Sequence, residues 1–152
     1  MSTGEAFNAY TRDRKAVITP LVHLTRSRYD QGPGLNVTAA SAVGWARDLA
    51  PPWSLVRRYK AGDLTDETYT EIYTRQLETL PAEIFDVIYE TGLAQPRQRL
   101  VFQCFCLAGA FCHTHILIDY LVQRYPARFC DARPLFMKPH NEALAALRLD
   151  NK

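Results

Sequence analysis

The segment from Leu100 to Cys106 (LVFQCFC) limits the possible folds more than any other part of the chain. It is apolar at nearly every position and shows no alternation of polar and apolar residues, which is typical of a strand buried inside a parallel sheet. A short glycine-containing loop follows, and residues 112–124 (CHTHILIDYLVQR) then predict a deeply packed helix. Strand, short loop and buried helix form a βα unit, so we expect an α/β protein.

The rest of the chain extends this expectation to a three-layer α/β/α sandwich with a mainly parallel central sheet. The 152 residues suit one domain, 1–152, with a single core. Apolar residues make up 47% of the chain and charged residues 22%, which excludes a wholly disordered protein. Residues 16–28 indicate a strand interrupted by Pro20, and residues 35–39 a second, short strand.

Three helices are predicted between the short strand and the buried strand. The first begins near Pro52 and ends at Gly62, because proline suits a first helical turn and glycine a helix end. The second begins after Thr65, whose hydroxyl can cap it, and the third begins at Pro81 and ends at Gly92.

Composition also excludes several classes of protein. No apolar run is long enough to span a membrane, and the first ten residues lack the features of a secretory signal, so we expect a cytoplasmic protein without a membrane partner. The net charge of +2 is too small to indicate nucleic-acid binding. The four cysteines crowd into the last third of the chain, which favours reduced thiols over a disulfide scaffold.

Charge is distributed unevenly along the chain. Residues 1–60 hold nine basic and four acidic residues, whereas residues 61–100 hold three basic and eight acidic ones. The simple interpretation is a basic face next to an acidic helix. The alternative is a basic rim for an anionic ligand, formed by Arg26, Arg28, Arg57, Arg58 and Lys60.

The start of the predicted 112–124 helix is the best candidate for a site. Ligands of open α/β sheets bind where strands end and helices begin, and a thiol there is biased toward the thiolate. We therefore expect Cys112 and His113 to be catalytic, with His113 as a hydrogen-bond donor or acid/base. The expected ligand-binding residues are Cys106, Gly109, Thr114, His115, Arg57 and Arg58.

Simpler interpretations apply to the neighbouring residues. Cys104 lies within the predicted strand and is expected to be a small core residue, and Cys130 is expected to pack. Asp119 lies one helical turn after His115 and can orient its imidazole, or the two form a surface pair. We assign no metal ligand and no cofactor. Zinc remains the alternative, because Cys104 and Cys106 point to one face of a strand and can converge with Cys112.

Several segments occur in an order that resembles the domain of unknown function 488 family, especially its small phage and prophage members. They are residues 34–38 (GLNVT), 49–56 (LAPPWSLV), 59–65 (YKAGDLT) and 104–113 (CFCLAGAFCH). The resemblance covers about residues 30–125, which leaves 126–152 as a C-terminal extension. It implies an α/β/α sandwich with a pocket at the Cys-His segment, and no established reaction. Family members usually carry arginine after Cys-His, where this chain has Thr114. Either the anion site is weaker here, or Arg26, Arg57 or Arg58 replaces that arginine.

Two functions follow as expectations. The first is a site for a small anionic ligand, a nucleotide or another phosphorylated metabolite, at residues 106–115, with turnover left open. The second is a phage accessory protein without an active site that binds a host protein through aromatic residues such as Trp45, Trp53 and Tyr59.

Overall fold

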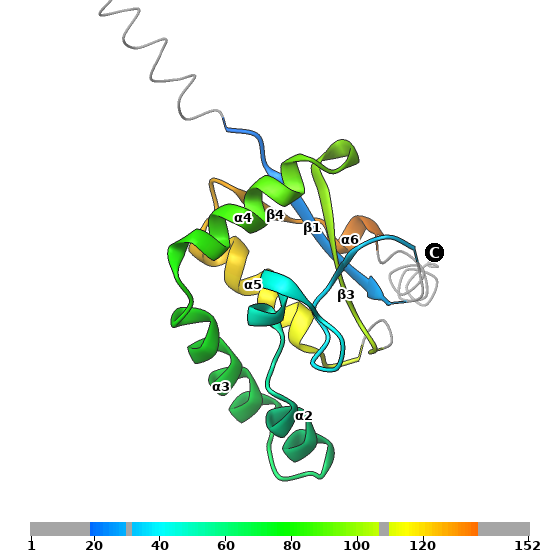
Figure 1. Ribbon diagram of the computed structural model, residues 1–152, viewed down its shortest axis with the longest axis vertical. Helices are drawn as coiled ribbons and strands as arrows, with labels where there is room; N and C mark the ends of the chain where they lie inside the picture. Colours follow the sequence, from blue (N-terminus) through cyan, green and yellow to red (C-terminus); the bar gives the residue numbers. More distant parts are fainter. Residues whose placement is uncertain (1–18, 30–31, 107–109, 137–152) are drawn as a thin grey trace, which may run out of the picture.

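Two neighbouring parallel strands form the centre of the protein: β1 (Val22–Arg28) and β3 (Arg99–Cys104) (Figure 1). The computed structural model describes residues 19–29, 32–106 and 110–136. Strand β2 (Leu35–Asn36) pairs with β3, and β4 (Phe129–Asp131) pairs with the opposite edge of β1. The order is β2-β3-β1-β4 with every pair parallel, which confirms the predicted single-domain α/β fold.

The helices follow the expected order. Helix α2 (Trp53–Lys60) begins after Pro52, and α3 (Asp66–Glu78) begins after Thr65, whose Oγ1 accepts a hydrogen bond from the Thr68 amide at 3.1 Å. The remaining described helices are η1 (Gly44–Leu49), α4 (Ala82–Leu93), η2 (Pro96–Gln98), α5 (His113–Arg124) and α6 (Arg133–Phe136).

Gly92 has a role beyond the predicted one. It is the penultimate residue of α4, so the helix ends within one residue of the predicted position, and a Cβ on Gly92 would collide with the side chain of Val22 in β1. Glycine is therefore required because the helix approaches the sheet closely there.

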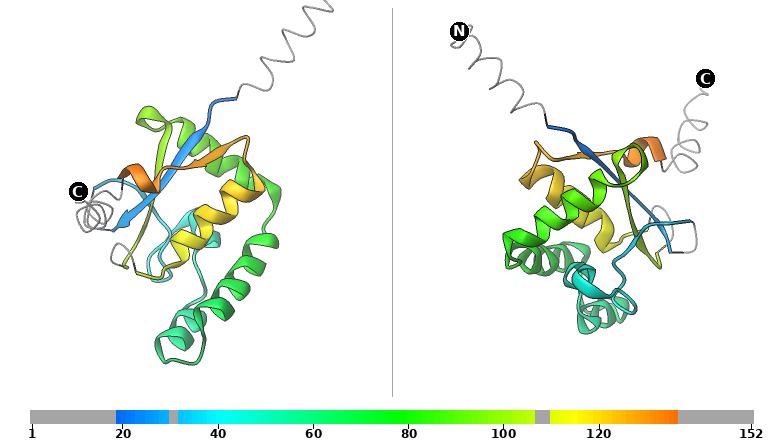
Figure 2. Two further views of the ribbon diagram at one scale, coloured as in Figure 1. Left: turned by 180° about the vertical axis from the view of Figure 1, so that it is seen from behind. Right: turned by 45° about the horizontal axis from the view of Figure 1, so that its top comes forward.

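Helices α4 and α5 cover the same face of the sheet. Val22 packs under α4, and Arg26, which points to the same side of β1, contacts Thr114 of α5. The reason is topological: the β2–β3 and β3–β4 crossovers run in the same direction across the sheet, and right-handed crossovers then lie on one face. Helix α3 packs along α5, and α2 packs against α3 (Figure 2).

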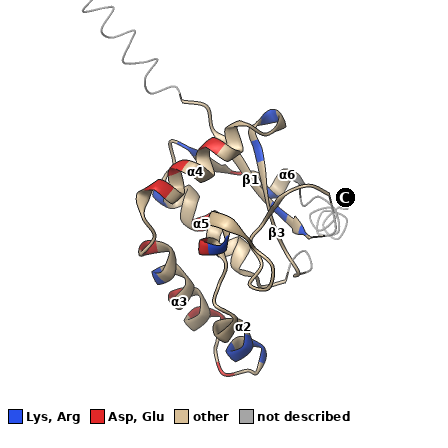
Figure 3. Cartoon of the chain, viewed as in Figure 1, with Lys and Arg blue, Asp and Glu red and all other residues tan. Residues whose placement is uncertain are grey.

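The uneven charge distribution has a structural counterpart. The last turns of α2 carry Arg57, Arg58 and Lys60, while acidic residues lie on α3 and α4 (Figure 3). The basic helix α2 contacts the acidic helix α3 through Tyr59, whose hydroxyl donates to Asp66 at 2.6 Å. A basic helix end next to an acidic helix therefore accounts for three of the nine basic residues in 1–60.

The chain after residue 125 adds to the same sheet, as far as it is described. Strand β4 and helix α6 lie in the segment expected to be an extension, and the Ala132 amide donates to the Leu24 carbonyl at 2.8 Å. None of the described helices has both the length and the apolar character to cross a bilayer.

Candidate functional site

Three cysteine thiols meet where β3 ends and α5 begins. The Sγ atoms of Cys104, Cys106 and Cys112, here called the thiol cluster, all lie within 4.8 Å of one another. Cys104 is the last residue of β3, Cys112 is the N-cap of α5, and their sulfurs are 3.0 Å apart. The side chains of Cys104 and Cys112 are buried and that of Cys106 is half-buried. Cys104 is thus buried as expected, but it belongs to a polar cluster instead of the apolar core.

A buried arginine supports the thiol cluster. Arg26 of β1 is only 3% exposed, and its Nη2 donates to Cys104 Sγ at 2.6 Å and to the Cys106 carbonyl at 2.8 Å. Among the described residues, no carboxylate forms an ion pair with it. A buried guanidinium requires a neighbouring negative charge, and the sulfur that it contacts is the group able to supply one.

The three thiols share this negative charge unequally. Hydrogen bonds from the thiols of Cys106 and Cys112, together with the charge of Arg26, place the pKa of Cys104 well below its usual range. The hydrogen bonds to Cys104 and burial raise the pKa of Cys106, and the pKa of Cys112 is also raised, chiefly by its hydrogen bond to Cys104. The geometry therefore favours one thiolate, on Cys104, with two neutral thiols beside it.

Thr114 links the same arginine to the third sulfur. Its Oγ1 accepts a hydrogen bond from Arg26 Nε at 3.1 Å and donates to Cys112 Sγ at 3.2 Å. Thr114 is fully buried, so it acts inside the cluster and not on a ligand. Of the basic residues considered as replacements for an arginine at this position, Arg26 is the one that reaches the site.

The surroundings of His113 do not suit the predicted role in acid/base catalysis. Its Nε2 donates to the Val37 carbonyl at 2.7 Å, which leaves Nδ1 without a proton, 3.8 Å from Cys112 Sγ. Burial lowers the pKa of this imidazole to about 4. His113 is therefore neutral at pH 7, and its ring N–H is already used by the backbone.

An aromatic cavity opens directly onto the thiol cluster. It has a volume of about 180 Å³, and all three cysteines of the cluster line it. Its other walls include the rings of Trp53, Tyr59, Tyr69, Phe105 and Phe111, together with Lys60. The rings of Tyr59 and Tyr69 pack against Phe111 with centroids 5.0 and 5.3 Å away. Of the described cavities, this aromatic cavity is the one that all three cysteines of the thiol cluster line.

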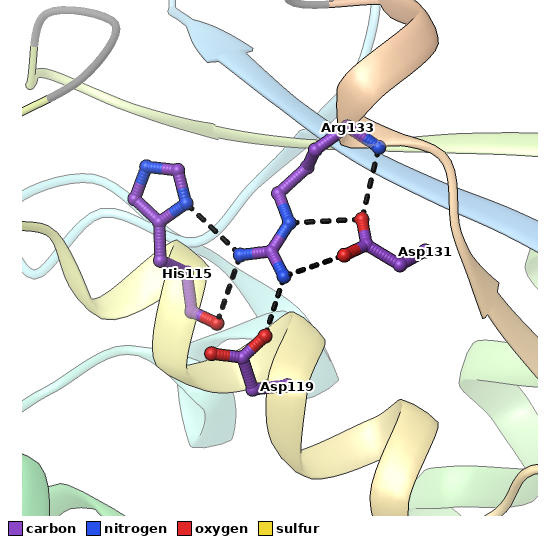
Figure 4. Close-up of polar contacts among 4 residues, drawn as sticks. All are labelled: His115, Asp119, Asp131 and Arg133. Carbon is purple, nitrogen blue, oxygen red and sulfur yellow. Dashed lines mark hydrogen bonds and ion pairs between the residues drawn. The ribbon is translucent and has the colours of Figure 1, made fainter.

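A second, wider cavity of about 920 Å³ is also lined by Phe111 and Cys112. His115 lines it, and Arg133 of α6 donates from Nη1 to His115 Nδ1 at 3.0 Å (Figure 4). Arg133 is itself fixed by Asp131, at 2.9 Å from Nε and 2.8 Å from Nη2, and by Asp119. The sequence left open whether Asp119 orients His115 or forms a surface pair with it; in the structure Arg133 contacts both residues. Burial and the charge of Arg133 lower the pKa of His115.

The remaining predicted site residues lie in different places. Cys106 lines the aromatic cavity, whereas Arg57 and Arg58 are exposed on α2 and line neither cavity. Gly109 lies outside the described residues. Cys130 is apart from the thiol cluster, with its sulfur 3.0 Å from His23 Nδ1.

Sequence reasoning missed Arg133 and named Arg26 only as one of several basic residues that could bind an anion. A signal for Arg26 existed: it follows Val22 and Leu24 at alternate positions, so it lies on the buried face of its strand. A charged residue in such a position needs a specific partner. No comparable signal marks Arg133: Asp131 lies two positions before it, but the partners that bring it to the cavity, His115 and Asp119, come from α5.

The family comparison agrees with this part of the molecule. The model DUF488-N3a, described as the active DUF488-N3 subclade, matches residues 22–125, which run from β1 through α5. Searches of curated proteins and of solved structures found no match. The chain belongs to the DUF488 family, within the group described as the active DUF488-N3 subclade.

Proposed function

We propose that the protein binds a small phosphorylated ligand, a nucleotide or a related metabolite, in the aromatic cavity next to the thiol cluster. The observation that carries this proposal is the composition of the cavity wall. Aromatic rings, one lysine and three sulfurs line the same small space. Each kind of group suits a different part of such a ligand.

The aromatic rings suit a planar base. Stacking of a base on an aromatic side chain contributes about 1–3 kcal/mol. A cavity of about 180 Å³ has room for a ring but not for a whole nucleotide. The sugar and phosphate would therefore extend toward the opening.

Lys60 suits the phosphate. It is exposed, lies in the last turn of α2 and lines the aromatic cavity. Its ammonium group is a strong donor to phosphate oxygens. Arg57 and Arg58 lie on the same helix away from the cavity, so they serve as matched controls for a general charge effect.

The thiol cluster gives the site a wall of sulfur atoms. Cys106 is the least buried of its three residues and lines the cavity where the ligand would lie. Its pKa is raised, so Cys106 meets the ligand as a neutral thiol, a polarizable contact and weak donor. Cys112 and His113 then act as buried supports of this wall.

The experiment uses the fluorescence of Trp53, which lines the cavity, in a Trp45→Phe background. AMP, GMP, ribose 5-phosphate and inorganic phosphate are titrated in turn. We expect saturable quenching by a mononucleotide, about tenfold weaker binding in Lys60→Ala and little change in Arg58→Ala. Absence of saturation with every probe, or equal losses in the two variants, overturns the proposal.

A protein partner is the second candidate, and one observation favours it. Trp53 and Phe105 at the cavity are 48% and 47% exposed, which suits anchors of a protein interface. The two candidates differ in what they need from Lys60, which lines the cavity. Partner binding through Trp53 and Phe105 is expected to survive Lys60→Ala, whereas nucleotide binding is expected to weaken about tenfold.

A further inference from the structure

We propose that the thiol cluster binds one soft divalent metal ion, for which zinc is the best match, through Cys104, Cys106 and Cys112. This inference goes beyond the proposed ligand binding and does not depend on it. It starts from the convergence of three sulfurs from a strand end, a loop and a helix N-cap. Thiolates are preferred ligands of zinc, and of soft ions generally.

The sulfur spacing fits a tetrahedral ion. Zinc–sulfur bonds of about 2.3 Å place two sulfur ligands about 3.8 Å apart. The Cys104 and Cys112 sulfurs are 3.0 Å apart, and every pair in the cluster lies within 4.8 Å. The required spacing falls inside this range, so shifts of the side chains by less than about 1 Å would form the site.

Charge balance provides an independent argument. Three thiolates around a divalent ion carry a net charge of −1, and Arg26, buried beside them, carries +1. The whole buried unit is then neutral, which avoids the cost of burying an unpaired charge. A fourth thiolate would destroy this balance. The fourth cysteine of the chain, Cys130, lies elsewhere against His23.

Two of the three sulfurs that would bind the metal already accept hydrogen bonds from neighbouring side chains. Arg26 Nη2 donates to Cys104 Sγ, and the Thr114 hydroxyl donates to Cys112 Sγ. Arg26 also donates to the Cys106 carbonyl, which fixes the loop carrying the third sulfur. Such hydrogen bonds orient metal ligands and tune their charge, and their loss typically weakens metal binding about 10- to 100-fold.

The cavity indicates which kind of metal site this is. All three cysteines line the aromatic cavity, so the fourth coordination position lies on that side. Structural zinc sites have four protein ligands, whereas catalytic sites keep one position open for water or substrate. We therefore assign the cluster to the open, three-ligand class, with a bound ligand or water as the fourth donor.

The experiment uses the full-length protein, stripped of metal and kept reduced. Co²⁺ is titrated anaerobically as a spectroscopic probe, and Zn²⁺ is then added to displace it. We expect one ion per chain, thiolate-to-cobalt charge-transfer absorption in the near ultraviolet, and visible bands typical of tetrahedral cobalt. Zinc should remove all of these bands.

Two variants separate this site from adventitious binding. Cys106→Ser should reduce the charge-transfer intensity by about one third and weaken binding at least about tenfold, while Cys130→Ser should change neither. Cys106 lies beyond the end of β3 and is half-buried, so its variant is expected to fold, which circular dichroism checks. Absence of the bands, or equal losses in the two variants, overturns the metal site. Nucleotide titration of the metal-free protein tests the proposed function separately.

Discussion

Arg26 Nη2 lies 2.6 Å from Cys104 Sγ, although the two residues are 78 positions apart in the chain. The contact joins the carboxyl-terminal parts of two parallel strands, β1 and β3. It brings a permanent cation to the only part of the described chain where three thiols meet. The charge, the sulfurs and the cavity therefore form one unit.

The first prediction concerns this contact. Arg26→Met should destabilise the protein by about 3–5 kcal/mol, because it leaves a buried thiolate without its partner or forces it to take up a proton. Urea denaturation measures the difference. Arg128→Met is the control, since Arg128 pairs with Asp86 at the surface and should cost less than about 1 kcal/mol. Equal losses in the two variants would argue against a special role for Arg26.

The second prediction is a pH dependence that originates at His113. Its pKa is about 4 in the folded protein and about 6.5 in an unfolded chain. The unfolded state therefore binds the extra proton first, so the stability that this residue contributes is complete above pH 6.5 and decreases as the pH falls toward 4. The loss amounts to roughly 3 kcal/mol.

Metal-free wild type and His113→Asn are compared by urea denaturation at pH 7 and pH 5. The variant should lose less stability between these two values than the wild type does. If both proteins respond alike, His113 is not the origin of the dependence.

How much of the fold and of the site could be predicted from the sequence depends on how far apart in the chain the contacting residues are. The β3–α5 unit and the Thr65 cap follow from local patterns, and both appear as expected. The thiol cluster is local in part, since its three cysteines lie within nine positions. The contact between Arg26 and Cys104 depends instead on how β1 and β3 are aligned. Their parallel register pairs Arg28 with Cys104, which places Arg26, two residues earlier, within reach of the sulfur. Hydrophobic periodicity does not specify such a register between strands so far apart.

The third prediction tests the packing of α4 on the sheet. Gly92→Ala should destabilise the protein by about 1–3 kcal/mol, because the added methyl group collides with Val22. Glu90→Ala, at an exposed position of the same helix, should stay within about 0.5 kcal/mol of the wild type. Thermal unfolding of both variants provides the comparison. A Gly92→Ala protein as stable as Glu90→Ala would show that the helix can move away freely.

The fourth prediction concerns His115 and its arginine. Arg133→Gln removes a positive charge next to the imidazole, so the pKa of His115 should rise. The pKa of Asp131 should rise as well, because its hydrogen bonds to Arg133 hold it below the usual range. NMR titration of the side chains measures both. Arg124→Gln, on the helix α5 that carries His115, is the control and should leave both pKa values unchanged. If the pKa of His115 is the same in the two variants, the contact between His115 and Arg133 is contradicted.

The aromatic cavity and its sulfurs are tested most directly by the rate at which Cys106 is alkylated. Iodoacetamide modification of the metal-free protein is followed by peptide mass spectrometry, with and without a saturating mononucleotide. Cys130, which is also half-buried but lies outside the cavity, serves as the internal standard. We predict that the nucleotide slows modification of Cys106 several-fold and leaves Cys130 unaffected. Unchanged modification of Cys106, or equal slowing at both cysteines, would contradict a ligand site at the thiol cluster.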